Sequence, residues 1–104
     1  MSAVAERMPK IEASVERAMQ LIKADPGVSP VLVAVVKELE KKLVKVRPII
    51  QSGDAAKIRE AVVEVEQAAD SAKAAAEADT GAKEETRAAI IAAHDRFCIL
   101  KVNM

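Results

Sequence analysis

The fold is decided by residues 30–50, PVLVAVVKELEKKLVKVRPII, where apolar side chains recur every three or four positions. This spacing aligns them along one face of an α-helix, and such a stripe must be buried against another helix. Three further stretches, residues 4–22, 58–76 and 86–100, repeat the pattern. The sequence therefore predicts one all-α domain over residues 1–104, built as a helical bundle. In residues 30–50 the apolar stripe consists of Leu32, Val36, Leu39, Leu43, Val46 and Ile50.

Proline and glycine place the ends of the first two helices. Pro9 suits the first turn of a helix, so the first helix is predicted to become regular there, or to begin earlier with Ser2 to Met8 as an extension. Asp25-Pro26-Gly27 ends it, and Ser29-Pro30 has the character of an N-cap followed by a first helical residue. Pro48 lies inside the second apolar pattern, and a proline there removes a backbone hydrogen bond. We therefore expect the second helix to end or kink near Pro48.

The second half of the chain has similar boundary signals. Ser52-Gly53 completes the break after the second helix, and Asp54 is the expected cap of the third. Asp79-Thr80-Gly81 separates the third helix from the fourth. Glu84 and Glu85 then fall in the first turn of the fourth helix, where the helix dipole favours acidic side chains. The predicted helices are residues 9–24, 30–51, 54–78 and 81–101.

The short junctions determine the predicted topology. Helices joined by a few residues run antiparallel, which gives an up-down-up-down four-helix bundle. The four segments share their periodicity, but we identify no motif that repeats at a fixed interval. A closed bundle is therefore expected, not a solenoid of repeats.

Composition excludes several classes of function. The 16 basic and 16 acidic side chains cancel, so no overall field favours nucleic acid or an anionic membrane. Phe97 is the only aromatic residue, which argues against stacking sites for bases, sugars or flat cofactors. No glycine-rich phosphate loop is present, and no apolar run is long enough to span a membrane. We expect no cofactor, no metal and no small-molecule substrate.

The N-terminal sequence and the cysteine content bear on location. MSAVAERMPK contains acid, base and proline where a signal peptide needs an apolar run. The single cysteine, Cys98, cannot form an internal disulfide, which agrees with a reducing compartment. Both features predict a cytoplasmic protein.

The second predicted helix has more apolar surface than one seam requires. Val33 and Val44 lie well outside its stripe, and Ile99 does so on the fourth helix. Either that helix contacts two neighbours, or these residues form an exposed patch for a partner. The same helix is basic and includes Lys41 and Lys45, whereas the third helix is acidic. The charges are interpreted either as a solvated, mutually paired surface or as a docking face for an acidic partner.

His94 is the only histidine, and it lies near the apolar side of the fourth helix. The simplest interpretation is a partly buried ring hydrogen-bonded to a backbone carbonyl or to a neighbouring helix. His94 and Cys98 are four residues apart, a spacing that brings both to one helix face. That pair supplies two metal ligands where structural zinc needs four. Nothing in the sequence marks an oxyanion site or a third residue for nucleophilic catalysis by Cys98.

A helical bundle with one helix-borne histidine resembles a histidine-containing phosphotransfer domain. The resemblance implies an exposed imidazole, followed three residues on by lysine, with glycine next to that lysine. In the sequence HDRFCILK, which begins at His94, these positions hold Phe97 and Cys98. The resemblance therefore covers the architecture alone.

These observations predict a non-catalytic bundle that acts through protein–protein contact or self-association. The candidate contact surface comprises Val33, Val44, Lys41, Lys45 and Ile99. The alternative hypothesis is a signalling module phosphorylated on His94.

Overall fold

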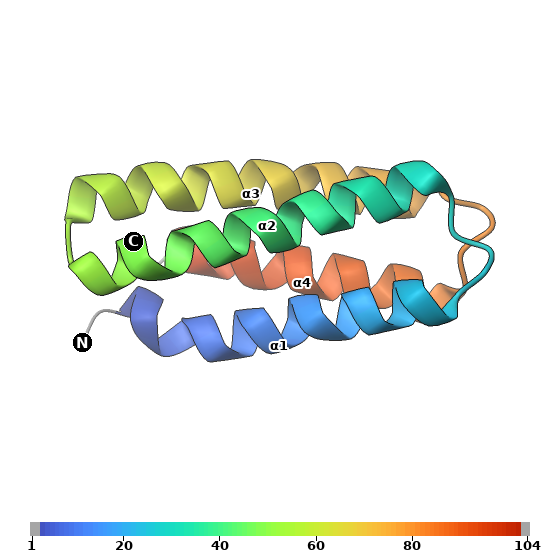
Figure 1. Ribbon diagram of the computed structural model, residues 1–104, viewed down its shortest axis with the longest axis horizontal. Coiled ribbons are helices and arrows are strands. Elements are labelled where there is room, and N and C mark those ends of the chain that lie inside the picture. Colours follow the sequence, from blue (N-terminus) through green and yellow to red (C-terminus); the bar gives the residue numbers. More distant parts are fainter. Residues whose placement is uncertain (1–2, 103–104) are drawn as a thin grey trace.

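The computed structural model describes the backbone of residues 3–102 and the side chains of residues 5–100 (Figure 1). Four helices make up this region, and each contacts the next, with α4 returning to α1 to close the ring. Sequential helices run antiparallel, so the predicted up-down-up-down four-helix bundle is confirmed. The helices are α1 (Ala3–Ala24), α2 (Pro30–Ser52), α3 (Ala55–Ala78) and α4 (Glu84–Val102).

The caps of α2 and α3 follow the sequence signals. The Ser29 hydroxyl accepts a hydrogen bond from the Leu32 N–H at 3.2 Å, and Pro30 follows as the first helical residue. The Asp54 carboxylate accepts hydrogen bonds from the N–H groups of Ala56 and Lys57. These oxygens satisfy N–H groups that have no partner within the helix.

Two prolines lie inside helices: α1 includes the expected extension before Pro9 from Ala3 onwards, and α2 continues past Pro48 to Ser52, one residue beyond the predicted range of 30–51. Both proline side chains are exposed, while Met8 and Ile50 beside them are buried in the core. The buried neighbours hold the extra turns in place, which offsets the hydrogen bond that each proline removes.

α4 begins at Glu84 and not at the predicted residue 81. The reason lies in two aspartates that hold the preceding residues in a loop. Asp79 Oδ1 accepts hydrogen bonds from the N–H groups of Gly81 and Ala82, and Asp25 Oδ2 accepts one from the Lys83 N–H at 2.8 Å. These residues are therefore held outside the helix, whose first turn contains Glu84 and Glu85 as expected.

A fixed interval of 54 residues, from Asp25 to Asp79, relates the α1–α2 hairpin to the α3–α4 hairpin. The same interval pairs Gly27 with Gly81 in the loops. It also pairs buried positions in the helices, so the expectation of no motif at a fixed interval is wrong. The buried pairs are Ile11 with Val65, Val15 with Ala69, Ala18 with Ala72, Val36 with Ile90, Leu39 with Ala93, Leu43 with Phe97 and Val46 with Leu100.

The two loops cross at one end of the bundle and exchange equivalent hydrogen bonds. Asp25 binds the Lys83 N–H just before α4, and Asp79 binds the Ser29 N–H just before α2, each at 2.8 Å. A Cβ added to Gly27 would collide with the Gly81 carbonyl oxygen, and the reverse also holds. Both glycines are required because the two backbones touch there.

Candidate functional site

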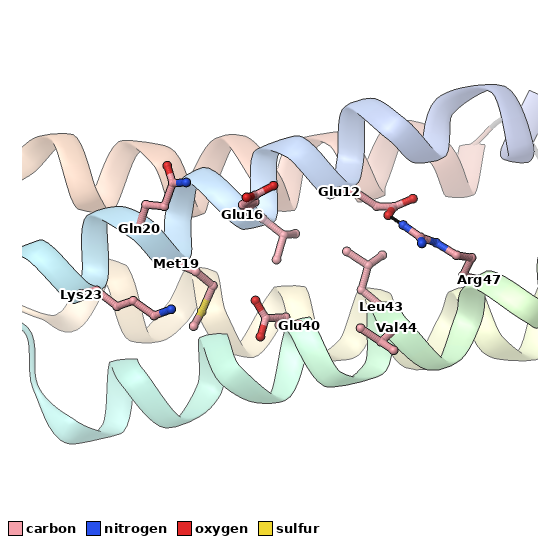
Figure 2. A pocket seen from close by; sticks show the side chains of 10 residues that line it. Glu12, Glu16, Met19, Gln20, Lys23, Glu40, Leu43, Val44 and Arg47 are labelled. Atoms are coloured by element: carbon pink, nitrogen blue, oxygen red, sulfur yellow. Dashed lines mark ion pairs between the residues drawn. The ribbon is translucent and has the colours of Figure 1, made fainter.

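A groove of about 440 Å³ runs between α1 and α2 (Figure 2). Val15 and Met19 line it from α1, and Leu43 and Val44 line it from α2. The Met19 and Leu43 side chains point into the space between the helices, and charged side chains surround them. The groove thus has an apolar floor and a polar rim, the combination found in many binding sites.

Residue size on α1 contributes to the opening of this groove. α1 and α2 approach each other in fewer places than any other neighbouring pair. At the corresponding positions α1 carries Val15 and Ile22 where α3 carries Ala69 and Ala76. Alanine allows helix axes to approach closely, whereas larger side chains keep them apart. The larger α1 side chains therefore contribute to the wider spacing of α1 and α2.

Three carboxylates and two cations surround the groove. Glu12 forms an ion pair with Arg47 at one end, and Lys23 lies at the other. Glu16 and Glu40 line the groove between these ends from opposite helices, and both are exposed. Within residues 5–100 neither of these two carboxylates forms an ion pair. The middle of the groove is therefore negatively charged.

Val44 stands on the rim of the groove and is 69% exposed. Lys41 and Lys45 lie on the solvent-facing side of the same helix, as does Lys37 one turn earlier, and all three are exposed. At about 100° per residue, Lys37 lies about 20° and Lys41 about 60° around the helix from Val44, whereas Lys45 is about 100° away. We call Lys37, Lys41 and Val44 the α2 ridge.

The remaining members of the predicted contact surface lie elsewhere. Val33 is partly buried and packs against the core, as expected for a helix with two neighbours. Ile99 is 50% exposed on α4, where it lines a depression of about 370 Å³ between α1 and α4 together with Ile11. α4 does not adjoin α2 in the ring, so Val44 and Ile99 do not belong to one continuous patch.

A third depression, of about 910 Å³, runs along the face formed by α2 and α3. It is more open than the α1–α2 groove, and the apolar side chains of Ile49 and Val63 in it are partly buried. None of the large exposed hydrophobic side chains of the described residues lies there. The α1–α2 groove is therefore the better candidate for a binding site.

His94 is 9% exposed, and its ring is held by carboxylates. Its Nε2 lies 2.6 Å from Asp70 Oδ1 on α3, and its Nδ1 lies 3.2 Å from Asp95 Oδ1 on its own helix. The hydrogen bond to Asp70 joins α4 to its neighbour α3. Both ring nitrogens are engaged, and the surrounding negative charge repels a phosphoryl group. The geometry does not favour phosphotransfer.

Cys98 lies beside this histidine but is poorly suited to nucleophilic catalysis. Its Sγ is 3.6 Å from His94 Nε2. Burial, followed by the negative charges of Glu66, Asp70 and Asp95, raises the pKa of the Cys98 thiol above its ordinary value. The thiolate is the reactive form, and this environment disfavours it. Among the described residues, no three His, Cys, Asp or Glu side chains form a group that could hold a metal ion.

Sequence reasoning missed the groove residues Met19, Glu16 and Glu40. Two signals pointed to the two glutamates. Glu12 and Glu16 are four residues apart, as are Lys37 and Lys41, and a like-charged pair at this spacing weakens an isolated helix. The 54-residue interval also aligns Glu40 with His94, so the two hairpins differ in chemistry at equivalent positions.

The comparisons with known proteins leave the site to be interpreted from its geometry. No protein-family model matches the chain, and no curated protein or solved structure is significantly similar to it. Among the described residues, none of the helices combines the length and the apolar character needed to cross a bilayer.

Proposed function

We propose that this chain is a non-catalytic protein-interaction module whose docking site is the α1–α2 groove. The observation that carries the proposal is Val44, a large hydrophobic side chain that is 69% exposed on the rim of an apolar-floored groove. The four-helix core does not need Val44, because the seam of α2 is already complete without it. Burial of its side chain by a partner would remove that apolar surface from water.

The charges around the groove support the same function. Glu16 and Glu40 line it from opposite helices, and neither has an ion-pair partner among the described residues. A partner that places an apolar side chain on the floor and a cation between these carboxylates would satisfy both features. Such a polar rim around an apolar centre is typical of protein interfaces.

Site-specific photo-crosslinking tests the proposal. A photoreactive phenylalanine analogue at position 44 is expected to form a discrete adduct with one protein in an extract of the native source. The matched control carries the analogue at Ala88, which is exposed on α4 away from the groove. The adduct from position 44 should be lost when Glu16→Lys and Glu40→Lys are added.

The outcomes separate docking from chance contact. Equal labelling from positions 44 and 88, or an adduct that persists after both charge reversals, would show that the groove does not select a partner. Failure to form any adduct from position 44 would also reject this docking site.

A further inference from the structure

We propose that the groove is occupied by a second copy of this chain, in a two-fold symmetric dimer. The α2 ridge of each copy packs over the α1–α2 groove of the other. This inference rests on the groove being a protein-docking site, and it names the partner. In such a dimer each copy offers the same ridge and the same groove, so one set of complementary residues is used twice.

Charge complementarity between ridge and groove carries the inference. The ridge contains two lysines beside Val44, and the groove contains Glu16 and Glu40 between its two ends. Within residues 5–100, Lys37 and Lys41 form no ion pair, and neither do these two glutamates. The chain thus presents an unpaired basic surface immediately next to an unpaired acidic one, both on the same side of the bundle.

The lysine spacing strengthens the argument. A lysine occupies every fourth position from 37 to 45 (Lys37, Lys41 and Lys45), so the charges repel along one side of α2. Like-charged pairs at this spacing destabilise a helix. An acidic surface placed over these lysines relieves this repulsion, and the groove of a second copy provides such a surface.

A two-fold axis brings these groups together in register. Suppose that the axis lies level with the midpoint between residues 40 and 41 of α2. The two α2 helices then run antiparallel across the interface. Lys41 of each copy then faces Glu40 of the partner subunit, and Lys37 faces Val44 of the partner subunit. The aliphatic stem of Lys37 can cover that valine while its ammonium group extends towards the groove carboxylates.

Charge exchange between two variants tests the dimer. We expect light scattering at about 100 μM chain, well above a micromolar Kd, to give about twice the 11.1 kDa mass of one chain. Variant A carries Lys37→Glu and Lys41→Glu, and variant B carries Glu16→Lys and Glu40→Lys. Each alone places like charges across the interface, so self-association should weaken about tenfold or more. An equimolar mixture of A and B should restore the dimer, because both contacts become attractive again.

The matched control carries Lys57→Glu and Arg59→Glu, which make the same change in net charge on exposed positions of α3. It should remain dimeric, and circular dichroism should show that every variant is helical. A monomeric wild-type chain, dimeric A and B variants, or a mixture that stays monomeric would overturn the inference.

The result is separable from the proposed function. If the purified chain is monomeric but position 44 still crosslinks selectively to another protein, docking in the groove stands and the second copy is excluded. If neither contact occurs, both proposals fail.

Discussion

Gly27 and Gly81 face each other across the crossed loops, and each is required because of the other's backbone. Gly53 has a different requirement. Its φ of 76° is left-handed, and the space around it is open. The same residue type therefore serves close approach at two positions and backbone conformation at the third.

This difference predicts that the alanine and asparagine variants rank in opposite order of stability at Gly27 and at Gly53. Gly27→Ala should lower the free energy of unfolding by about 1–3 kcal/mol because its Cβ overlaps the Gly81 carbonyl. Gly27→Asn should cost more, since its side chain is larger. At Gly53, Asn should be tolerated better than Ala because it adopts left-handed backbone more readily. Urea denaturation of the four variants measures the order, and equal ranking at both positions would contradict it.

The two interhelical loops are held mainly by the carboxylates of Asp25 and Asp79. Hydrogen bonding from the Lys83 N–H is the largest cause that lowers the pKa of Asp25, and the Ser29 N–H has the same effect on Asp79. Both effects outweigh the burial of these carboxyls, which acts in the opposite direction. The charged forms are thus favoured in the folded protein.

Stability should consequently fall in acid. Because both pKa values are lower in the folded state, this stabilisation is present above the ordinary value of 3.8 and is lost as the pH falls through the folded values. Asp25→Asn/Asp79→Asn should melt several degrees below wild type at neutral pH, and the gap should narrow as the pH is lowered below 3.8. Asp54→Asn is the control, since asparagine also caps helices well. Thermal unfolding, monitored by circular dichroism, measures the difference in melting temperature. A difference that did not change with pH would contradict the prediction.

At the level of the helices, the sequence predicts the features that depend on neighbouring residues alone. Ser29 and Asp54 were identifiable as caps because a cap depends on neighbouring N–H groups. Pro9 and Pro48 do not end their helices, because burial of the nearby Met8 and Ile50 outweighs the local backbone cost. The groove depends on which side chains face each other across two helices, and periodicity within one helix does not contain that information. Val44 was recognised as surplus apolar surface, but its glutamate neighbours were not.

The whole molecule is a pair of similar hairpins related by an approximate two-fold arrangement. The loops of both hairpins cross at one end of the bundle, and the α2–α3 connection lies at the other (Figure 1). Their cores match by position while their surfaces differ: the first hairpin has an open acidic groove, and the second has a closely packed histidine. Matching burial with different surface chemistry fits the proposal that the first hairpin binds a partner while the second stabilises the bundle.

The equivalence of the hairpins predicts that their order in the chain is not important. The beginning of α1 and the end of α4 lie at the same end of the bundle as residues 52–54. A circular permutant that starts at Asp54, ends at Gly53 and joins the original termini by a short flexible linker keeps every interhelical contact. It should have the same helical content and a Tm within about 5 °C of wild type, because only an exposed connection is opened.

A matched permutant opened between Pro26 and Gly27 provides the control for that experiment. This cut separates Asp25 from the Gly27 N–H that it binds at 2.9 Å, and it disrupts the crossed loops that join the hairpins. We expect it to melt well below the permutant opened at Gly53, or to lose cooperative unfolding. If both permutants were equally stable, the crossed loops would not be the connection that holds the hairpins together, and the bundle would depend on its core alone.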